Sequence, residues 1–499
     1  MKLCDVMRGI ECEIIQRGDR GDVVGVVIDS RKVREGSLYV CLRGLQADGH
    51  RFIFDVARGG AAAVVIDRDQ DSYPPGIAVW KVNDARKSLA KIAANFCGNP
   101  ADKLRLFGVT GTNGKTSVTY MMEAILEQGV GSWPSVGLIG TVGLRLGGKV
   151  IDIPFSTSTT PDPPELHQIF GYVLERGGPV PMAPVPMAPI PIVMEVSSHA
   201  LALHKMENLH FEVAMFTNLT QDHLDFHGTM ENYLAAKAKL FGQCRYAVVN
   251  TDDKYSPQIM SIGNPERWIT YGIENECDLR AIHIEDKDAG SCFDVKINGV
   301  VESFFLPVKG RFNIYNALAA IGAALAVDMD VEQIRAGLAS FAGVPGRIQS
   351  VPNDRGFHVL VDYAHTPDGL VNIINAVRAF TEGKVVTLFG CGGDRDAEKR
   401  PIMGRIAGEL SDFCILTSDN PRSEPPEAII RQIEDGIKDT NCDYNCIEDR
   451  REAIFFGVGI LEAGDALIIA GKGHENYQLI GDETLIFDDV EVAKEALGQ

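Results

Sequence analysis

The sequence predicts an α/β protein of three domains, and three observations support this prediction. The chain has 499 residues and a hydrophobic fraction of 45%, so it can bury more than one core. Short apolar stretches alternate with helical stretches, as in parallel sheets covered by helices. Breaks at Asn99-Pro100 and around Gly343 interrupt this alternation. We therefore expect domains at residues 1–102, 103–343 and 344–499.

Each block contains its own strands. The first is expected to be a small α/β domain, with β-rich patches at 23–28, 38–42 and 61–66. The second should hold a parallel nucleotide-binding sheet, with strands that include 136–140 and 192–196. The third is expected to be Rossmann-like, with strands at 357–361, 385–389, 413–417 and 466–470. These last strands end in polar or glycine-rich turns, where open α/β sheets bind ligands.

Residues 104–119 carry the strongest functional signal. They read LRLFGVTGTNGKTSVT, which is an apolar strand, a glycine-rich turn and the start of a helix. Gly111 and Gly114 let backbone N–H groups close around phosphate oxygens, and the helix presents its positive end. Lys115 can reach the outer phosphates and Thr116 can hold Mg²⁺. The segment therefore predicts a nucleoside-triphosphate phosphate loop.

The spacing of this loop is a variant of the usual one. The pattern G-x-x-x-x-G-K-[ST] would place its first glycine at position 109, where this chain has Val109. The alternative is a glycine-rich turn from strand to helix that carries a surface lysine. The strand before the loop and the helix after it favour the phosphate loop.

Charge and cysteine usage exclude several classes. The net charge of −20 argues against a nucleic-acid or anionic-membrane partner, so an anionic ligand must meet locally placed Lys and Arg. The 11 cysteines include no C-x-x-C pair, which favours reduced thiols in a cytoplasmic protein.

We expect neither an export signal nor membrane insertion. Asp5, Arg8 and Glu11 interrupt the amino-terminal stretch that an export signal would keep apolar. The longest uncharged run, 177–194, contains six prolines that would break a transmembrane helix. Its repeated VPMAP unit predicts a stiff, proline-rich insertion at 177–191.

Two clusters in the second block suit metal or phosphate contacts. Glu195 ends an apolar strand, where its carboxylate could hold Mg²⁺ opposite Thr116. The segment 217–229 places Asp222, His223, Asp225 and His227 within six residues. The alternative for both clusters is helix capping and turn formation, which Ser, Asp and Asn favour.

Several strings occur together in the order seen in the Mur ligases of peptidoglycan synthesis, and the chain resembles that family over nearly its whole length. The strings are GTNGKTS, MEVSSHAL, TNLTQDHLDFHGT, YLAAKAKLF, GRFNIYNALAA, VPGR and VDYAHTPD. Three more strings resemble the members that add the third amino acid. These are GCGGDRDAEKRP at 390–401, SDNPRSE at 418–424 and GKGHENYQ at 471–478.

The resemblance implies an ATP-dependent ligase that works as a monomer on small-molecule substrates. ATP would phosphorylate the D-glutamate γ-carboxylate of UDP-MurNAc-L-Ala-D-Glu, and the amine of meso-diaminopimelate would attack the acyl phosphate. The products would be the UDP-MurNAc-tripeptide, ADP and phosphate. Two anions must approach each other, so positioning and positive charge matter most.

The resemblance also implies roles around ATP and Mg²⁺. Lys237 would be carried as a carbamate, although a helix-surface lysine beside Lys239 remains the alternative. The catalytic residues implied are Lys115, His223, Lys237 and Arg347. The metal ligands implied are Thr116, Glu195, His223 and carbamylated Lys237. The ATP-binding residues implied are Gly111, Thr112, Asn113, Gly114, Lys115, Thr116, Ser117, Asn316, Arg347 and Asp362.

A third group is implied for the UDP-linked substrate. It consists of Ile28, Ser30, Leu45, Gln46, Ala47, Ser158, Thr159, Thr160, Ser197 and Lys205. The chain departs from the family pattern after VSSH, where Leu203 and Lys205 stand at positions that can hold glutamine and arginine. A lysine still meets a phosphate as a point charge, but it lacks the bidentate fork of arginine.

The amino-acid site implied consists of Arg395, Asp419, Asn420, Pro421, Arg422, Gly471 and Glu475. Arg422 offers a donor fork for the distal carboxylate of meso-diaminopimelate. L-lysine lacks that carboxylate and would place an ammonium beside the arginine, at a cost of roughly 2–5 kcal/mol in a dry pocket. Without the resemblance, SDNPRSEPPE could equally be a loop with a solvated arginine.

Two alternatives remain open, together with a hypothesis about motion. A related ligase that adds L-lysine, or glutamate to folate, should lack the DNPR string. A nucleotide-dependent scaffold would use the fold for binding alone. We also expect Arg347 and Asp362 to reach ATP when the third block closes onto the second.

Overall fold

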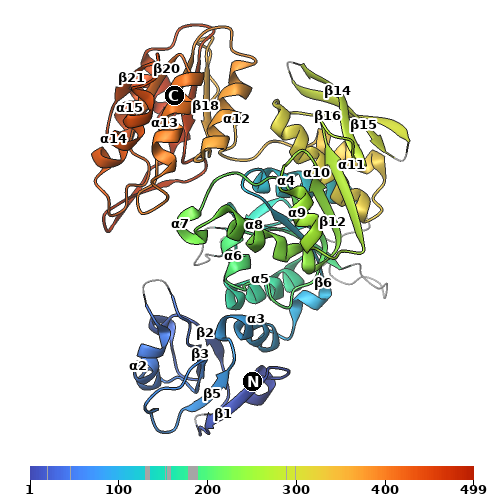
Figure 1. Cartoon of the computed structure of the whole chain (residues 1–499), viewed down its shortest axis with the longest axis vertical. Coiled ribbons are helices and arrows are strands. Elements are labelled where there is room, and N and C mark those ends of the chain that lie inside the picture. Colours follow the sequence, from blue (N-terminus) through green and yellow to red (C-terminus); the bar gives the residue numbers. More distant parts are fainter. Residues whose placement is uncertain are drawn as a thin grey trace.

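The computed structural model describes residues 1–19, 21–44, 47–129, 135–151, 153, 159–177, 189–287, 289–297 and 299–499. Leu45, Gln46, Ser158 and most of the predicted insertion 177–191 lie outside the described residues. The chain forms three blocks, each built around a sheet: the first lies at the bottom of Figure 1, the central block above it, and the third at the upper left beside the central block. The predicted α/β class is therefore confirmed, whereas the domain boundaries stay a prediction.

The first block holds a five-stranded sheet in the order β1-β5-β4-β3-β2. All neighbouring strands are parallel except β1 and β5. The strands are β1 (Cys12–Gln16), β2 (Gly25–Val27), β3 (Ser37–Val40), β4 (Ala63–Ile66) and β5 (Ala78–Val82), and the helices are α1 (Leu3–Val6), α2 (Ile53–Arg58) and α3 (Ala85–Phe96). Asp84 caps α3, because its carboxylate accepts from the N–H groups of Arg86 and Lys87.

The central block holds an eleven-stranded sheet among the described residues, in the order β16-β15-β14-β13-β12-β11-β6-β10-β7-β8-β9. Its strands are β6 (Leu104–Thr110), β7 (Gly137–Gly140), β8 (Gly143–Leu146), β9 (Lys149–Ile151), β10 (Ile190–Glu195), β11 (Phe211–Phe216), β12 (Cys244–Asn250), β13 (Arg267–Gly272), β14 (Leu279–Lys287), β15 (Gly290–Ile297) and β16 (Val300–Leu306). Strands from β7 to β14 in this order are parallel, and antiparallel strands extend both edges.

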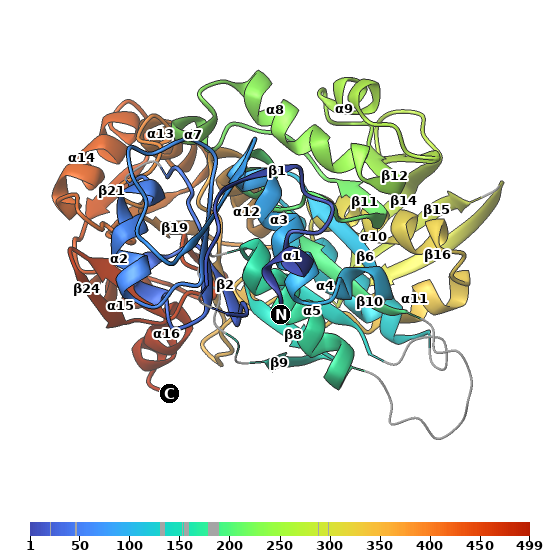
Figure 2. The same cartoon turned by 90° about the horizontal axis from the view of Figure 1, so that it is seen from below.

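Both faces of the central sheet are buried, which explains why β6 is apolar at nearly every position. Phe107 and Val109 pack against α4, α10 and α11, whereas Leu106 packs on the opposite side against α5, α6 and α8. The helices of this block are α4 (Lys115–Glu127), α5 (Pro163–Arg176), α6 (Ser198–Ala202), α7 (Leu224–His227), α8 (Met230–Ala238), α9 (Ser256–Ile262), α10 (Arg311–Ala326) and α11 (Val331–Ala339). Helix α5 also packs against α3 of the first block (Figure 2).

The third block holds a six-stranded sheet in the order β17-β18-β22-β19-β20-β21, parallel except for β17. A separate hairpin is formed by β23 (Tyr477–Ile480) and β24 (Glu483–Ile486). The sheet strands are β17 (Gln349–Ser350), β18 (His358–Asp362), β19 (Val385–Phe389), β20 (Phe413–Leu416), β21 (Asp443–Cys446) and β22 (Ala466–Ala470). Helices α12 (Pro367–Arg378), α13 (Lys399–Leu410) and α14 (Pro426–Ile437) cover one face, and α15 (Arg450–Gly459) and α16 (Asp489–Leu497) cover the other.

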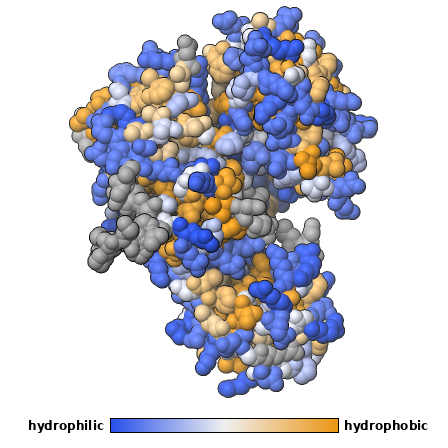
Figure 3. Space-filling model, turned by 180° about the vertical axis from the view of Figure 1, so that it is seen from behind, coloured by the Kyte–Doolittle hydropathy of each residue, from blue (hydrophilic) through white to orange (hydrophobic). Residues whose placement is uncertain are grey.

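The surface seen in Figure 3 is mostly hydrophilic, with apolar residues in scattered patches over the blocks. Within the described residues, no helix combines the length and the apolar character that crossing a membrane requires.

Helix α11 approaches the phosphate-loop helix α4 so closely that Gly337 has no room for a side chain. A Cβ at Gly337 would lie 2.4 Å from the Cα of Ile125. We predict that Gly337→Ala lowers the free energy of unfolding by about 1–3 kcal/mol, because backbone must move. Gly171 in α5 is the control, since a Cβ there would have no neighbour within 4 Å in the described part of the chain, and Gly171→Ala should stabilise by about 0.5–1 kcal/mol.

Thermal unfolding of the full chain, measured for Gly337→Ala and Gly171→Ala, tests this prediction. A Gly337→Ala protein as stable as the wild type would show that α4 and α11 are not packed in this way.

Candidate active site between the central and C-terminal blocks

A cavity of about 640 Å³ lies where the central and third blocks meet. The phosphate loop and the start of α10 line it from the central block, and residues between Ile348 and Phe380 line it from the third block. The predicted ATP-binding residues that line it are Asn113, Gly114, Thr116, Ser117, Asn316, Arg347 and Asp362. The volume, and a lining that combines apolar side chains with a few polar groups, suit a nucleotide-sized ligand.

The phosphate loop runs from the end of β6 to Lys115, the first residue of α4, as the sequence predicts. Its two glycines are required by the backbone and by their neighbours. Gly111 has φ +155°, and a Cβ there would lie 1.8 Å from Oγ1 of Thr217. Gly114 has φ +85°, and a Cβ there would lie 2.3 Å from Oδ1 of Asn316. The predicted ATP-contacting Asn316 therefore lies directly against the loop.

The half-buried Lys115 and the buried Lys237 converge on the carbonyl oxygen of Gly111. Lys115 Nζ donates to it at 3.0 Å and to the Thr112 carbonyl at 2.8 Å, and Lys237 Nζ donates to it at 2.7 Å. Burial lowers the pKa of Lys115, and the nearby positive charge of Arg347 lowers it further. Burial and the charge of Lys115 also hold the pKa of Lys237 well below its usual range. Lys237 is 1% exposed, so the alternative of a surface lysine is wrong.

Oxygen donors gather beside these lysines. The Thr116 hydroxyl donates to Oε1 of Glu195 at 3.1 Å, so the hydroxyl and the carboxylate predicted to hold Mg²⁺ are adjacent. Thr141 donates to the same carboxylate through its N–H at 2.9 Å and through its hydroxyl at 3.0 Å. Hydroxyl and carboxylate oxygens are the ligands that Mg²⁺ prefers, so this pair fits the ion. Sequence reasoning did not identify Thr141.

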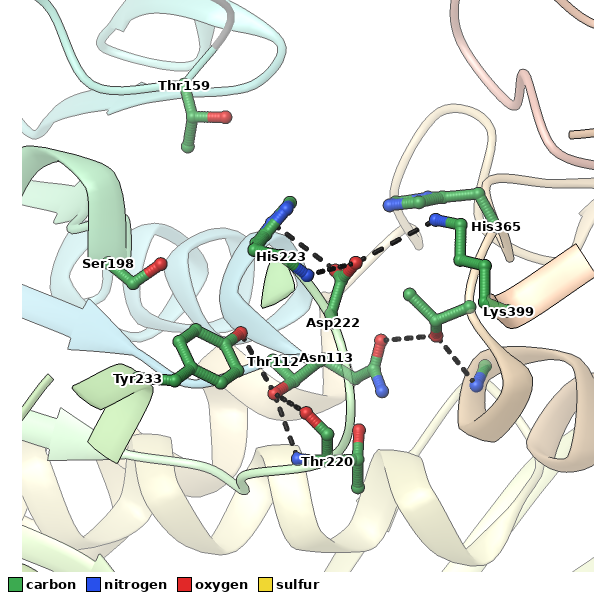
Figure 4. A network of polar contacts seen from close by, with 12 residues as sticks. Thr112, Asn113, Thr159, Ser198, Thr220, Asp222, His223, Tyr233, His365 and Lys399 are labelled. Carbon is green, nitrogen blue, oxygen red and sulfur yellow. Dashed lines mark hydrogen bonds and ion pairs between the residues drawn. The ribbon is translucent and has the colours of Figure 1, made fainter. Parts of the chain in front are cut away.

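Asp222 lies between His223 and Lys399 (Figure 4). His223 has a left-handed backbone with φ +54°, and its Nε2 lies 3.3 Å from Oδ2 of Asp222. Burial lowers the pKa of His223 to about 3, so the ring is neutral and its nitrogen can bind a metal. Burial would raise the pKa of Asp222, but His223 and Lys399 outweigh it and lower that pKa to about 2. Lys399 belongs to the quoted string GCGGDRDAEKRP, yet the prediction omitted it.

The phosphate loop also contacts the third block directly. Asn113 Nδ2 donates to Oδ2 of Asp368 at 2.8 Å, and the Thr366 hydroxyl lies 3.5 Å from Oδ1 of Asn113. Asp362 accepts from the N–H groups of Ile348 at 2.7 Å and Ala364 at 2.8 Å. The carboxylate of Asp362 therefore fixes the backbone at Ile348 and Ala364.

Arg347 lines the same cavity. Its guanidinium stacks on the ring of Tyr363, 4.6 Å from the ring centroid. The planar group is thus held in place before any anion approaches it.

The predicted amino-acid site is assembled from three loops of the third block. Asn420 Nδ2 donates to Oε2 of Glu475 at 2.7 Å, and a Cβ at Gly471 would lie 2.4 Å from Oδ2 of Asp419. Lys472 is fully buried, and its ammonium donates to Oδ1 of Asn420 at 3.3 Å. Sequence reasoning missed Lys472, because a lysine in a glycine-rich string looks like a surface residue.

The two arginines of this site differ in their surroundings. Arg422 is half-buried and follows the buried Pro421, and its Nη1 donates to the carbonyl oxygen of Gly393 at 2.8 Å. Arg395 is exposed and donates to the carbonyl oxygen of Asp394 at 3.1 Å. Both guanidiniums keep further N–H groups that can bind a carboxylate.

The residues predicted for the UDP-linked substrate fall into two places. Ile28, Ser30 and Ala47 lie in the first block. In the central block, the Thr160 hydroxyl lies 3.2 Å from Oγ of Ser197, and Thr159 Oγ1 lies 3.5 Å from Oγ1 of Thr141.

Lys205 lies close to this second group. Its Nζ donates to the Thr160 carbonyl at 3.4 Å and pairs with Asp162 at 2.8 Å. A substrate phosphate there would meet a lysine whose charge is already shared with a carboxylate.

Comparison with known proteins places this fold and site in one class: the chain belongs to the Mur ligase family, whose members are amide-forming ligases. Three family descriptions match it: "Mur ligase family, catalytic domain" at residues 22–97, "Mur ligase middle domain" at 109–324, and "Mur ligase, glutamate ligase domain" at 346–473.

Individual proteins similar to this chain share the name UDP-N-acetylmuramoyl-L-alanyl-D-glutamate–2,6-diaminopimelate ligase. The protein of that name from Caldanaerobacter subterraneus subsp. tengcongensis is 45% identical over 100% of this chain and 99% of its own length. That from Clostridioides difficile is 42% identical over 100% of both. A solved structure of a ligase of this name has TM-score 0.66 and 30% identity, and covers 100% of this chain and 99% of its own.

The likeness of fold extends to more distant members. The structure of the MurF ligase from Thermotoga maritima in complex with ADP has TM-score 0.61 and 18% identity, and covers 95% of this chain and 96% of its own.

The buried histidines predict how stability depends on pH. Burial lowers the pKa of four histidines from 6.5 to about 4: His167, His227, His365 and His474. Above pH 6.5 both folded and unfolded chains keep these rings neutral. Between pH 6.5 and 4 these histidines bind protons in the unfolded chain but stay neutral in the folded chain. The free energy of unfolding therefore falls as pH falls. We predict that Tm decreases steadily over this window.

His167 provides a variant for this test, because it lies in α5 and its Nδ1 is buried without a hydrogen-bond partner among the residues that the structure describes. Substituting His167→Leu should flatten the decrease in Tm between pH 6.5 and 4, because the folded chain then no longer has to keep this ring neutral. Thermal unfolding at several pH values tests this, and a Tm that stays constant from pH 7 to 4.5 would contradict it.

Proposed function

We propose that the chain is an ATP-dependent ligase that adds meso-diaminopimelate to UDP-MurNAc-L-Ala-D-Glu in peptidoglycan biosynthesis. The observation that carries this proposal is the full-length similarity to ligases named for that substrate and amino acid. The buried phosphate loop and the loops that carry Asn420 and Glu475 support it. The products are the UDP-MurNAc-tripeptide, ADP and phosphate.

In the first step, an oxygen of the D-glutamate γ-carboxylate attacks the γ-phosphorus of ATP, and the bond to the ADP oxygen breaks. Both reactants are anions, so their approach needs fixed positive charge. Lys115 and Arg347 supply this charge: Lys115 belongs to the phosphate loop of the central block, and Arg347 lines the cavity from the third block. Asn316 and Asp362 line the same cavity and would hold the adenosine end of ATP.

Mg²⁺, when bound, would offset the charge of the phosphates during this step. Thr116 and Glu195 would hold one ion, because their oxygens are adjacent and of the right chemistry. His223 and Lys237 would hold a second, with Lys237 present as a carbamate. A lysine ammonium cannot bind a cation, but the lowered pKa of Lys237 favours the neutral amine that reacts with CO₂.

In the second step, the amine of meso-diaminopimelate attacks the carbonyl carbon of the acyl phosphate. The amide C–N bond forms, the C–O bond to phosphate breaks, and the nitrogen releases a proton. The carboxylates of Asp419 and Glu475, with the amide of Asn420 between their loops, suit an ammonium group. Arg395 and Arg422 provide guanidinium donors that suit the distal carboxylate.

For the UDP-linked substrate, we assign recognition to the first block and to the adjoining edge of the central block. Ser30, Thr160 and Ser197 offer hydroxyl groups, and Lys205 offers a shared positive charge. Because its nucleotide-linked substrate is soluble, we also propose that the enzyme is cytoplasmic and monomeric. We propose no nucleic-acid or membrane partner.

A product assay tests the proposal. Purified protein receives ATP, Mg²⁺ and UDP-MurNAc-L-Ala-D-Glu, with meso-diaminopimelate, with L-lysine or with no amino acid, and phosphate release is measured together with the mass of the product. We predict turnover with meso-diaminopimelate, and roughly 30-fold or more lower kcat/KM with L-lysine, from a penalty of at least about 2 kcal/mol.

The three arms separate the alternatives. A preference for L-lysine would contradict the role of Arg422. The absence of product with either amino acid would favour a nucleotide-dependent scaffold.

A further inference from the structure

The hairpin formed by β23 and β24, residues 477–486, lies along the loop that carries the proposed amino-acid site. Its backbone makes three hydrogen bonds with that loop. Leu479 N–H donates to Oδ1 of Asn420 at 3.0 Å, Arg422 N–H donates to the Leu479 carbonyl at 3.0 Å, and Gly481 N–H donates to the Arg422 carbonyl at 2.7 Å. Arg422 is thus bound to the hairpin through both of its backbone polar groups.

Arg422 needs this support, because its backbone has φ +52°. That left-handed conformation costs free energy in a residue with a Cβ, and it persists only where the surroundings hold it. The conformation decides where the guanidinium points, and here its Nη1 donates to the carbonyl oxygen of Gly393. The hairpin therefore helps to fix the direction of the arginine proposed to bind the distal carboxylate.

One side chain of the hairpin reaches under the same loop. Gln478 is 7% exposed, and its Nε2 donates to the Asp419 carbonyl at 2.7 Å and to Oγ of Ser418 at 3.3 Å. Its amide thus binds the residues immediately before Asn420. Gln478 thus reaches the main chain of Asp419 and the hydroxyl of Ser418, and not a side chain that is proposed to bind the substrate.

We propose that Gln478 is a positioning residue for amino-acid selection. It fixes the 418–422 loop against the 477–486 hairpin, so that Asp419, Asn420 and Arg422 face the substrate. The inference rests on the proposed function. It extends the determinants of selectivity beyond the DNPR string to a residue more than fifty positions further along the chain.

Gln478→Met tests this role, because methionine keeps the length of the side chain and removes both donated hydrogen bonds. We expect KM for meso-diaminopimelate to rise about tenfold, equivalent to ~1.4 kcal/mol. The KM values for ATP and UDP-MurNAc-L-Ala-D-Glu should stay within about twofold of the wild type. The ratio of kcat/KM for meso-diaminopimelate to that for L-lysine should also fall, since Arg422 loses its fixed direction.

Gln16→Met is the matched control. Gln16 Nε2 likewise donates twice to backbone carbonyls, to Pro74 at 2.8 Å and to Ile77 at 2.8 Å, but in the first block. This variant should lose similar hydrogen bonding without any change in KM for meso-diaminopimelate. A purely structural role of Gln478 would lower Tm or the active fraction in both variants and leave the substrate KM values unchanged.

The outcomes are distinguishable. An unchanged KM and an unchanged selectivity ratio in Gln478→Met would overturn the inference while wild-type turnover upheld the proposed function. Wild-type protein without turnover would overturn the proposed function itself. If Gln478→Met does not fold, Gln478→Asn serves the same test, because it keeps the amide and shortens its reach by one methylene.

Discussion

The site depends on two lysines, one half-buried and one fully buried, that share one carbonyl oxygen. Lys115 and Lys237 both donate to Gly111, in a chain whose net charge is −20. Burial lowers the pKa of each, so their charged forms are costly without nearby negative charge. Triphosphate oxygens at the loop, and conversion of Lys237 to a carbamate, would both supply that charge. The nearby carboxylates of Glu195 and Asp222 already favour the charged form of Lys115.

The same region ties the central and third blocks together. Asn113 contacts Asp368 across the cavity, and Asp222 pairs with Lys399 at the start of α13. Direct contacts therefore link the central block, which carries the phosphate loop, to the block whose loops are proposed to bind the amino acid. Closure of the third block on nucleotide binding remains a prediction, and these two contacts are the ones that it would strengthen or exchange.

Local patterns in the sequence predicted much of this arrangement. The strand, loop and helix around Gly111 and Lys115 were predictable, because turn chemistry and apolar runs act over a few residues. The identities of most site residues came from resemblance to a family. Contacts between distant segments were missed, such as Lys399 with Asp222 and Gln478 with Asp419. No local pattern encodes them, since packing of separate elements creates them. The left-handed backbone of Arg422 was missed for the same reason.

The central claim is that the cavity activates a carboxylate by phosphoryl transfer. The most direct test uses UDP-MurNAc-L-Ala-D-Glu labelled with ¹⁸O in the γ-carboxylate, with ATP and meso-diaminopimelate, and mass analysis of the released phosphate. Attack of the carboxylate on the γ-phosphorus predicts that one labelled oxygen appears in each phosphate. Amide product accompanied by unlabelled phosphate would contradict the account.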